Sequence, residues 1–250
     1  MNIVIPMAGA GSRFAKVGYK KPKPLIEING LPMIELVIRN IRPKTAHRFI
    51  FICQNQHIKD YDLREKLELW APGSVTIGIE ELTEGAACTV LKARDLIDND
   101  IPLMIANSDQ YIDMDINSYL KSGDERNLDG LIMTMFANDP KWSFVDLDDS
   151  GCVKKVVEKE MISNEGTVGI YNFARGIDYV AAAVKMINLN LRVNGEFYVA
   201  PVYNQLIQTG KKIGVFNVGD IDERMYGLGT PDDLEKFLKM PVSKSATATT

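Results

Sequence analysis

Apolar and polar positions are arranged in two different ways along the chain, and the change falls near residue 115. Before that point, short apolar or β-branched runs are separated by segments whose apolar residues recur at helical spacing. The runs predict strands at residues 3–5, 48–54, 74–80 and 102–106. The helical spacing predicts helices at residues 31–41, 58–70 and 84–97. Strands that alternate with helices indicate a mainly parallel sheet with helices on both faces.

The second part of the chain contains more strands. Four are predicted in quick succession, at residues 129–137, 142–148, 152–157 and 167–173, with turns at 138–140 and 149–151. Helices at 176–190 and 199–208, a strand at 212–218 and a helix from Pro231 to about Lys239 follow. Residues 240–250 are small and polar, so we expect a disordered tail there. No repeat or long linker divides residues 1–239, which predicts one α/β domain with a mainly parallel, Rossmann-like mixed sheet.

Composition narrows the class of protein. With 250 residues, 46% of them hydrophobic, the chain can bury a full core as one domain. Its net charge of −4 gives no basic footprint for nucleic acid. The three cysteines are widely spaced and odd in number, which argues for a reducing cytoplasm and against a disulfide framework or a zinc site. Without a signal-peptide pattern or a transmembrane run, we expect a cytoplasmic protein that binds neither nucleic acid nor membrane. The sequence leaves open whether the protein forms a homo-oligomer.

Small residues and cations follow the first predicted strand. Gly9 and Gly11 allow backbone N–H groups to converge on an anion, and Arg13 offers a guanidinium fork that matches phosphate oxygens. Further lysines follow in a segment that prolines keep extended: Lys20, Lys21, Pro22, Lys23 and Pro24. A Gly-x-Gly turn alone is often only a tight turn. With four cations after it, the turn favours a polyphosphate ligand.

Two common phosphate-binding motifs do not fit this stretch. The dinucleotide fingerprint requires a third glycine where Phe14 stands, and no Gly-Lys-Ser/Thr follows as a P-loop requires. Instead, G-A-G-S-R, nine residues and then K-P-L-I-E-I-N-G-L-P-M-I resemble the signature of sugar-phosphate nucleotidylyltransferases, also called NDP-sugar pyrophosphorylases. The resemblance extends from Met1 to about Leu238 and implies the nucleotide-diphospho-sugar transferase fold. It implies a nucleotide half at about residues 1–115 and an acceptor half at about 116–239.

The resemblance assigns roles to the residues of the opening motif. The loop that wraps the nucleoside triphosphate corresponds to Ala8, Gly9, Ala10, Gly11 and Ser12. Arg13 and Lys23 correspond to the catalytic residues that contact phosphates. A second nucleotide-binding loop, which contacts the base, corresponds to Glu84, Gly85 and Ala86, although these small residues are also typical of an ordinary helix start.

Asp109 follows a fully apolar strand, where a carboxylate either caps a turn or binds a cation. The resemblance implies that Asp109 binds Mg²⁺, with Mn²⁺ as an alternative. A magnesium ion that is bound to substrate phosphates usually needs only one or two protein carboxylates as further ligands. Many relatives have a second metal-binding aspartate in a W-x-D-x-G-T motif. The corresponding residues 225–230 place Gly227 at that position. Asp220 and Asp222 lie shortly before it and are candidate substitutes.

The acceptor site implied by the resemblance lies in the second part of the chain. Glu158 would bind hydroxyl groups and Lys159 the acceptor phosphate, with Gly169 completing the motif and Glu196 adding a contact. Without the resemblance, Glu-Lys is an ordinary surface pair. The nucleophile in such a reaction is already an anion, so no catalytic base is required, which agrees with a candidate site that lacks histidine.

The combined motifs look most similar to nucleotidylyltransferases of bacterial capsule loci, phosphoglutamine cytidylyltransferase among them. The resulting hypothesis is an enzyme that joins a nucleoside triphosphate, CTP by resemblance, to a phosphorylated acceptor and releases pyrophosphate. The acceptor is a sugar 1-phosphate or a capsule precursor such as phosphoglutamine. One alternative is a nucleotide-sugar glycosyltransferase that uses Asp113-Met114-Asp115 as its metal motif. The other is a non-catalytic nucleotide-binding module, which the glycine at position 227 favours.

Overall fold

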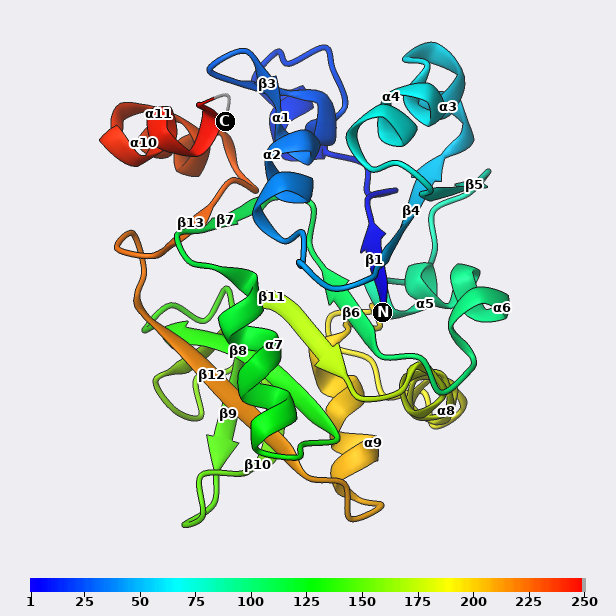
Figure 1. The fold of residues 1–250 in the computed structure, drawn as a ribbon, viewed down its shortest axis with the longest axis vertical. Coiled ribbons are helices and arrows are strands. Elements are labelled where there is room, and N and C mark those ends of the chain that lie inside the picture. Colours follow the sequence, from blue (N-terminus) through cyan, green and yellow to red (C-terminus); the bar gives the residue numbers. More distant parts are fainter. Residues whose placement is uncertain (249–250) are drawn as a thin grey trace.

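A nine-stranded mixed sheet runs through the molecule (Figure 1). The structure is a computed structural model, and it describes residues 1–248. The strand order is β10-β9-β11-β6-β1-β4-β5, and β8 pairs with β11 and β12 beside this path. The strands of the sheet are β1 (Asn2–Pro6), β4 (Arg48–Gln54), β5 (Val75–Ile79), β6 (Leu103–Ala106), β8 (Gly130–Phe136), β9 (Ser143–Leu147), β10 (Val153–Glu158), β11 (Glu165–Phe173) and β12 (Ile213–Asp220).

The direction of the strands gives the sheet two distinct ends. β1 runs parallel to β4 and β6, β4 runs parallel to β5, and β8 runs parallel to β12. β11 lies between β6 and β8 and is antiparallel to both. The two groups of parallel strands therefore run in the same direction. The carboxyl ends of β1, β6 and β8 consequently meet at one edge of the sheet, where ligands bind in folds of this kind.

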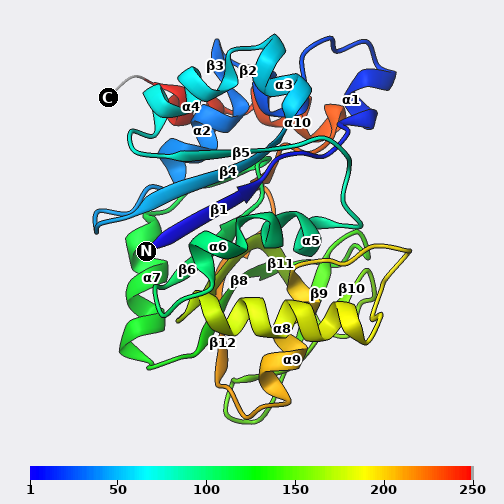
Figure 2. The ribbon, with the colours of Figure 1, turned by 90° about the vertical axis from the view of Figure 1, so that its right-hand side faces the viewer.

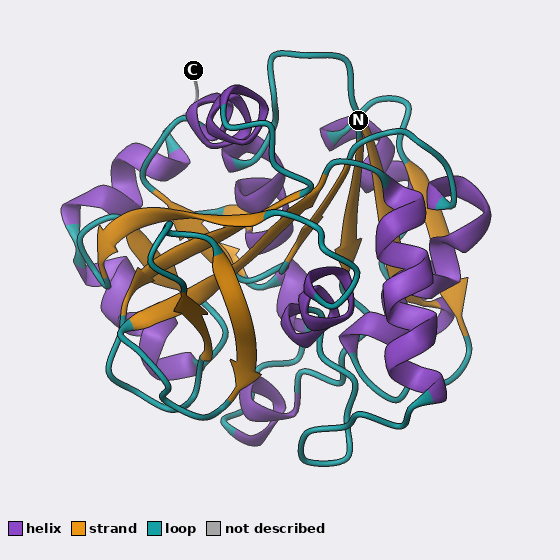
Figure 3. Cartoon of the chain, turned by 90° about the horizontal axis from the view of Figure 1, so that it is seen from below, coloured by secondary structure: helices purple, strands orange, loops and turns teal. Residues whose placement is uncertain are grey.

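Helices cover both faces of the sheet (Figures 2 and 3). Successive residues of β1 point to opposite sides, because Ile3 and Ile5 belong to one apolar core and Val4 to the other. The first core is closed by α2 (Met33–Asn40), α4 (Leu63–Trp70) and α7 (Ile116–Glu125), with α3 (Asn55–Asp60) at its margin. The second is closed by α5 (Ala86–Val90), α6 (Arg94–Ile97), α8 (Gly176–Asn188) and α9 (Tyr203–Ile207). Burial on both faces explains why the central strands are apolar throughout.

A third, smaller core joins the beginning of the chain to its end. Phe14, Tyr226 and Phe237 pack together in it, and Figure 1 shows the C-terminal helices beside the N-terminal segments. The remaining elements are α1 (Ser12–Lys16), η1 (Lys23–Leu25), β2 (Glu27–Ile28), β3 (Leu31–Pro32), η2 (Leu91–Ala93), β7 (Gln110–Ile112), η3 (Ala200–Val202), β13 (Met225–Gly227), α10 (Pro231–Lys239) and α11 (Pro241–Thr247). The short strands β7 and β13 pair with each other.

The predicted α/β fold with a mostly parallel central sheet is confirmed, but the prediction of a disordered tail from residue 240 was wrong for most of that segment. Residues 241–247 form α11, in which Ser243 is buried and its hydroxyl donates to the Met240 carbonyl at 2.8 Å. Val242 and Ala246 pack on the third core. The few apolar residues of this largely polar segment thus pack on the third core, a contact that sequence composition does not reveal. Residues 249–250 lie outside the described part of the chain.

Two predicted helices are interrupted. The segment predicted as a helix at 58–70 forms α3 and α4, because Asp62 between them has a left-handed backbone (φ 48°). The segment predicted at 84–97 forms α5, η2 and α6, and its first helical residue is Ala86. Gly85 before it has φ 129°, a conformation that side-chain-bearing residues rarely adopt.

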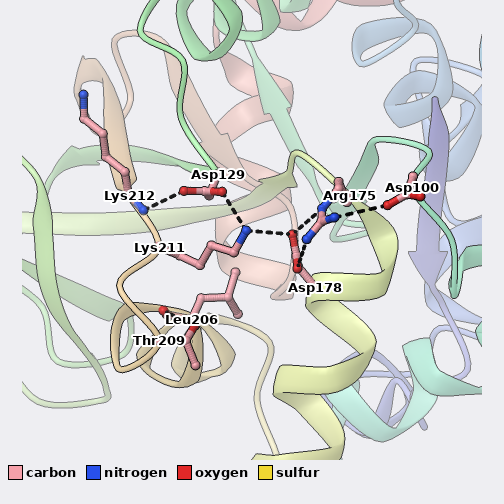
Figure 4. A network of polar contacts seen from close by, with 8 residues as sticks. All are labelled: Asp100, Asp129, Arg175, Asp178, Leu206, Thr209, Lys211 and Lys212. Carbon is pink, nitrogen blue, oxygen red and sulfur yellow. Dashed lines mark hydrogen bonds and ion pairs between the residues drawn. The ribbon is translucent and has the colours of Figure 1, made fainter.

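At the amino ends of the parallel strands, charged residues form a continuous chain of polar contacts (Figure 4). Asp129, directly before β8, accepts hydrogen bonds from Lys211 Nζ and from the Lys212 backbone N–H, both at 2.9 Å. Lys211 also pairs with Asp178 at 3.4 Å, and Arg175 bridges Asp178 at 2.8 Å and Asp100 at 3.3 Å. Figure 4 also shows the neighbouring turn, in which Thr209 Oγ1 donates to the Leu206 carbonyl at 2.8 Å. These contacts join segments that precede β6, β8 and β12.

Candidate active site

The opening loop leaves β1 at the carboxyl edge of the sheet. Gln54 at the end of β4 donates from Nε2 to the Ala8 carbonyl at 2.8 Å and holds the start of the loop. Gly11 then adopts a left-handed backbone (φ 62°) and precedes α1. A Cβ atom at position 11 would lie 3.5 Å from the Lys23 Cβ atom. The loop and the lysine segment, which the sequence separates, therefore lie side by side.

Lys23 and Asp109 form an ion pair at this edge. The Lys23 Nζ atom lies 2.7 Å from Asp109 Oδ2, and both side chains are partly buried. The backbone carbonyl of Asp109 accepts from the Leu228 N–H at 2.8 Å, which ties it to the segment after β13. A Cβ atom at Gly229 would lie 2.6 Å from Asp109 Oδ2, so the glycine leaves room for the carboxylate. The expectation that the opening segment and Asp109 share one edge is thereby confirmed.

The surroundings of Gly227 show which carboxylate approaches that position. Gly227 pairs with Gln110, the neighbour of Asp109, and a Cβ atom at position 227 would lie 3.9 Å from Asp233 Oδ2. Asp233 lies in the first turn of α10, where it accepts from Thr230 Oγ1 at 2.7 Å. Of the two substitutes considered from the sequence, Asp222 pairs with Lys236, and Asp220 is exposed at the end of β12.

Asp109 suits a magnesium ion that brings most of its oxygen ligands with it. Within residues 1–248 there is no group of three or more His, Cys, Asp or Glu side chains arranged to hold a metal. Magnesium commonly binds through one or two carboxylates together with substrate phosphates. The Asp109 carboxylate already faces one cation, the Lys23 ammonium 2.7 Å away.

A pocket of about 290 Å³ lies between the opening loop and the loop before α5. Among its lining residues are several that the sequence assigned to the nucleotide: Ala8, Gly9, Ala10, Gly85 and Ala86. A Cβ atom at Gly85 would lie 2.5 Å from the backbone N and O atoms of Phe197, so only glycine fits. Glu84 lines neither this pocket nor the adjoining one, because its carboxylate pairs with Arg192 at 2.9 Å.

A second pocket, of about 450 Å³, adjoins the first and shares Ala86 and Glu196 with it. It collects the acceptor residues that the sequence singled out, with one catalytic candidate: Arg13, Glu158, Lys159, Gly169 and Glu196. Sequence reasoning missed several of its lining residues: Asn107, Lys141, Trp142, Ser143, Thr167, Tyr171 and Tyr198. Gly11, Ser12, Lys23 and Asp109 line neither pocket, and of these Lys23 and Asp109 pair with each other.

Glu158 and Gly169 shape the floor of the second pocket. Glu158 ends β10 opposite Ser143 of β9, whose hydroxyl donates to its Oε2 atom. Burial raises the pKa of Glu158 above its ordinary value, although the hydrogen bond from Ser143 and the charge of Lys159 act in the opposite direction. Gly169 has φ 84°, and a Cβ atom there would lie 2.1 Å from Asn107 Nδ2. The glycine therefore allows Asn107, at the end of β6, to approach β11.

Lys159 is fixed at both ends. Its backbone is left-handed (φ 57°), and its N–H donates to the Trp142 carbonyl at 3.0 Å. Its Nζ atom donates to the Tyr198 hydroxyl at 2.6 Å and lies 4.7 Å from the centre of the Tyr198 ring. The hydrogen bond to Tyr198 raises the pKa of Lys159, and burial opposes it.

Comparison with known proteins identifies the family. The family model for "Nucleotidyl transferase" matches residues 3–195. The chain belongs to the nucleotidyl transferase family. It is therefore an enzyme of the nucleotidyltransferase class. The residues matched extend from β1 to the turn before Glu196 and include the opening loop and the loop before α5.

Several relatives of this nucleotidyltransferase cover nearly its whole length. The UTP–glucose-1-phosphate uridylyltransferase AglF of Haloferax volcanii is 22% identical over 241 residues, 94% of each chain. The bifunctional protein GlmU of Acetivibrio thermocellus is 25% identical over 230 residues, 88% of this chain and 47% of GlmU. This chain thus spans about half the length of its bifunctional relatives.

Solved structures show the same fold. A nucleoside-diphosphate-sugar pyrophosphorylase from Vibrio cholerae RC9 superposes with a TM-score of 0.79 at 28% identity, covering 95% of this chain and 100% of that one. The inositol-1-phosphate CTP transferase from T. maritima superposes with a TM-score of 0.76 at 18% identity, covering 99% and 98%.

The motif that favoured a glycosyltransferase has a structural role. Asp115 is the N-cap of α7, where its Oδ1 atom accepts from the Asn117 N–H at 3.0 Å, and it pairs with Lys44 at 3.6 Å. Asp113 is exposed, and its N–H donates to the Arg224 carbonyl. Neither carboxylate lines the two pockets.

Among the described residues, no helix has the length and apolar character needed to cross a membrane.

Proposed function

We propose that the nucleotidyltransferase joins a nucleoside triphosphate to a phosphorylated acceptor and releases pyrophosphate. The observation that carries this proposal is the pair of adjoining pockets that share Ala86 and Glu196. One pocket is lined by the glycine loop and suits the nucleotide. The other contains Arg13, Lys159 and a buried glutamate and suits an acceptor with an anionic group and hydrogen-bond donors. Two such sites with a common wall bring two substrates into contact.

The chemistry requires alignment and charge neutralisation. An oxygen of the acceptor phosphate attacks the α-phosphorus, the bond from that phosphorus to the bridging oxygen of the β-phosphate breaks, and pyrophosphate leaves with the electron pair. No side chain has to remove a proton. Lys23 and Arg13 would neutralise the phosphates of the two substrates, and Lys159 would bind the acceptor phosphate, because two polyanions must approach each other. Asp109, together with the phosphates, would hold a Mg²⁺ or Mn²⁺ ion, which would supply positive charge at the triphosphate. Asp233, which lies near position 227, is the candidate for a second carboxylate ligand.

Within this reaction class we propose CTP as the nucleotide and a sugar 1-phosphate or phosphoglutamine as the acceptor. The likeness of the sequence motifs to capsule-locus cytidylyltransferases supports CTP, and the fold is shared with a CTP transferase. Glu158 and Glu196 would accept hydrogen bonds from hydroxyl or amide groups of the acceptor. Both substrates suit a cytoplasmic enzyme.

The test is a matrix of the common nucleoside triphosphates against phosphorylated acceptors with Mg²⁺, read as pyrophosphate release. Turnover with CTP and one acceptor class is expected. The reverse reaction provides a second measurement, because one phosphoanhydride replaces another and the equilibrium is nearly balanced. Labelled pyrophosphate and the nucleoside-diphosphate product should regenerate labelled triphosphate. Sugar transfer to an alcohol without such exchange would support the glycosyltransferase, and thermal stabilisation by triphosphate without any turnover would support the non-catalytic module.

A further inference from the structure

Tyr198 is the residue that determines where the Lys159 ammonium lies. Its hydroxyl accepts from Lys159 Nζ at 2.6 Å, and its ring lies below the same ammonium at 4.7 Å. Both contacts leave the positive charge uncancelled, because the phenol is neutral. Burial raises the pKa of Tyr198, so it keeps its proton at neutral pH. A lysine held by a neutral partner still has its full charge available for a ligand.

Two carboxylates compete for this ammonium. Glu158 precedes Lys159 in the chain, and Glu196 lines the same pocket from the opposite segment. Both are close enough to contribute to the raised pKa of Lys159, after the larger effect of Tyr198. The other charged groups lining the pocket, Arg13 and Lys141, are cations. Without Tyr198, the flexible lysine side chain would turn to a carboxylate and its charge would be neutralised there.

The segment that carries Tyr198 is anchored to the loop before α5, the second of the two predicted nucleotide-binding loops. The Phe197 N–H donates to the Glu84 carbonyl at 2.8 Å, and the Phe197 carbonyl accepts from the Ala87 N–H at 3.0 Å. Arg192 pairs with Glu84 at 2.9 Å and lies 4.2 Å from the Phe197 ring centre. These contacts fix the position of Tyr198 relative to the loop before α5. Lys159 follows the end of β10 and reaches Tyr198 from there.

We propose that Tyr198 is a positioning residue that holds the Lys159 ammonium, uncancelled by Glu158 or Glu196, for the anionic group of the acceptor. The inference rests on the proposed function, since it concerns the acceptor side of that reaction. Tyr198 itself need not touch the acceptor. Its effect on acceptor binding is therefore exerted through Lys159. This distinguishes Tyr198 from a residue that lines the pocket and contacts the acceptor directly.

Steady-state kinetics of Tyr198→Phe provide the first measurement. The variant keeps the ring and loses the hydrogen bond, so the KM for the acceptor should rise about tenfold, equivalent to about 1.4 kcal/mol. The KM for the triphosphate should change less than about twofold. Tyr61→Phe, which removes a hydroxyl that donates to the Lys20 carbonyl outside the acceptor pocket, is the matched control and should behave as wild type. In a Lys159→Ala background, Tyr198→Phe should have no further effect, because the two residues act as one unit.

Chemical labelling of Lys159 tests the same inference without substrates. Acetic anhydride modifies only the free amine. Without the Tyr198 hydroxyl, Lys159 would pair with Glu158 or Glu196, and an ionised partner favours the protonated amine more than a neutral hydroxyl does. Lys159 in Tyr198→Phe should therefore be labelled at least about threefold more slowly at pH 8.5, measured by peptide mass spectrometry. Lys141 in the same digest is the internal control and should not change.

The two measurements separate the inference from the proposed function. Slower labelling without turnover of any acceptor would remove the proposed function but would still support the role of Tyr198 in positioning the Lys159 ammonium. Turnover with an acceptor, combined with an unchanged acceptor KM or unchanged labelling in Tyr198→Phe, would overturn the positioning role. A further loss of acceptor affinity in the Lys159→Ala background would overturn it as well, since Tyr198 would then act on its own.

Discussion

Charged residues gather at both ends of the parallel strands, and the two groups differ in how their charges are balanced. At the amino ends, Arg175 and Lys211 are each shared between two aspartates, with distances of 2.8 to 3.4 Å (Figure 4). At the carboxyl ends, Lys23 pairs with Asp109 alone, and Lys159 is held by the neutral Tyr198. Arg13 lines the acceptor pocket and, within residues 1–248, forms no ion pair.

The difference separates stability from function. In the network at the amino ends, Arg175 and Lys211 each have two acidic partners, and these contacts join segments that precede different strands. At the carboxyl ends, positive charge is placed by a glycine loop, by a left-handed lysine and by a tyrosine, and part of it stays uncancelled. In the proposed reaction, a polyanionic substrate would supply the missing negative charge. Mutations at the two ends should accordingly affect different measurements.

The largest expected effect is on turnover, from Lys23→Ala or Asp109→Ala. Each should lower turnover at least about a hundredfold, since removal of one group that stabilises charge in a transition state costs about 3–4 kcal/mol. The midpoint of thermal unfolding should change little, because the pair is partly exposed at a strand end. Pyrophosphate release is the measurement, with Lys44→Ala, which breaks a surface pair at 3.6 Å, as control. A wild-type rate in either variant would remove that residue from the mechanism.

The next effect concerns only one substrate. Lys159→Ala should raise the KM for the phosphorylated acceptor at least about tenfold, since a hydrogen-bonded charge contributes about 1.5–3 kcal/mol. The KM for the triphosphate should stay within about twofold, because Lys159 lines the larger pocket and not the one formed by the opening loop. Initial rates with each substrate varied in turn measure both constants. Equal changes in both would show that the assignment of Lys159 to the acceptor side is wrong.

At the opposite end of the sheet the expected effect is on stability alone. Asp129→Ala removes the acceptor of two hydrogen bonds from Lys211 and Lys212. Because the carboxylate is partly exposed, we expect a loss of about 1 kcal/mol, equivalent to a fall in the unfolding midpoint of about 2–4 °C. Turnover at 25 °C should match wild type. Asp149→Ala, in the exposed turn after β9, is the control and should leave both quantities unchanged. Reduced turnover in Asp129→Ala would mean that the two ends are not independent.

The comparison also shows how much of the molecule could be predicted from the sequence. The apolar runs predict the central strands, since burial on both faces leaves a continuous signal. The meeting of the opening segment with Asp109 follows from the rule that parallel strands share one carboxyl edge. For the segment predicted as a helix at residues 84–97, the start at Ala86, and not at Glu84, did not follow from local pattern, because Gly85 packs against Phe197, more than a hundred positions away.

The acceptor pocket shows the same limit more strongly. Ser143 was not predicted as a site residue, because only the register of the β9–β10 hairpin places it opposite Glu158. Tyr198 was missed although it lies two positions after Glu196, which the sequence did single out. Its importance depends on its contact with Lys159, 39 positions away. Local pattern predicts strand ends and loops, whereas contacts between distant loops require the structure.

The smallest expected effect is on the pH dependence of stability, at the amino-end network. Burial alone would raise the pKa of Asp129, but the hydrogen bonds from Lys211 and Lys212 outweigh it, and the pKa lies below its ordinary value of 3.8. A carboxyl group with a lowered pKa in the folded state stabilises the fold above its unfolded pKa, and this contribution is lost as the pH falls through the folded value. Asp129→Asn should therefore be less stable than wild type at pH 7, and the gap should narrow below about pH 4. Urea unfolding at pH 7, 4 and 3 measures it, and a gap that stays constant would mean that Asp129 stabilises the fold by packing and not by its charge.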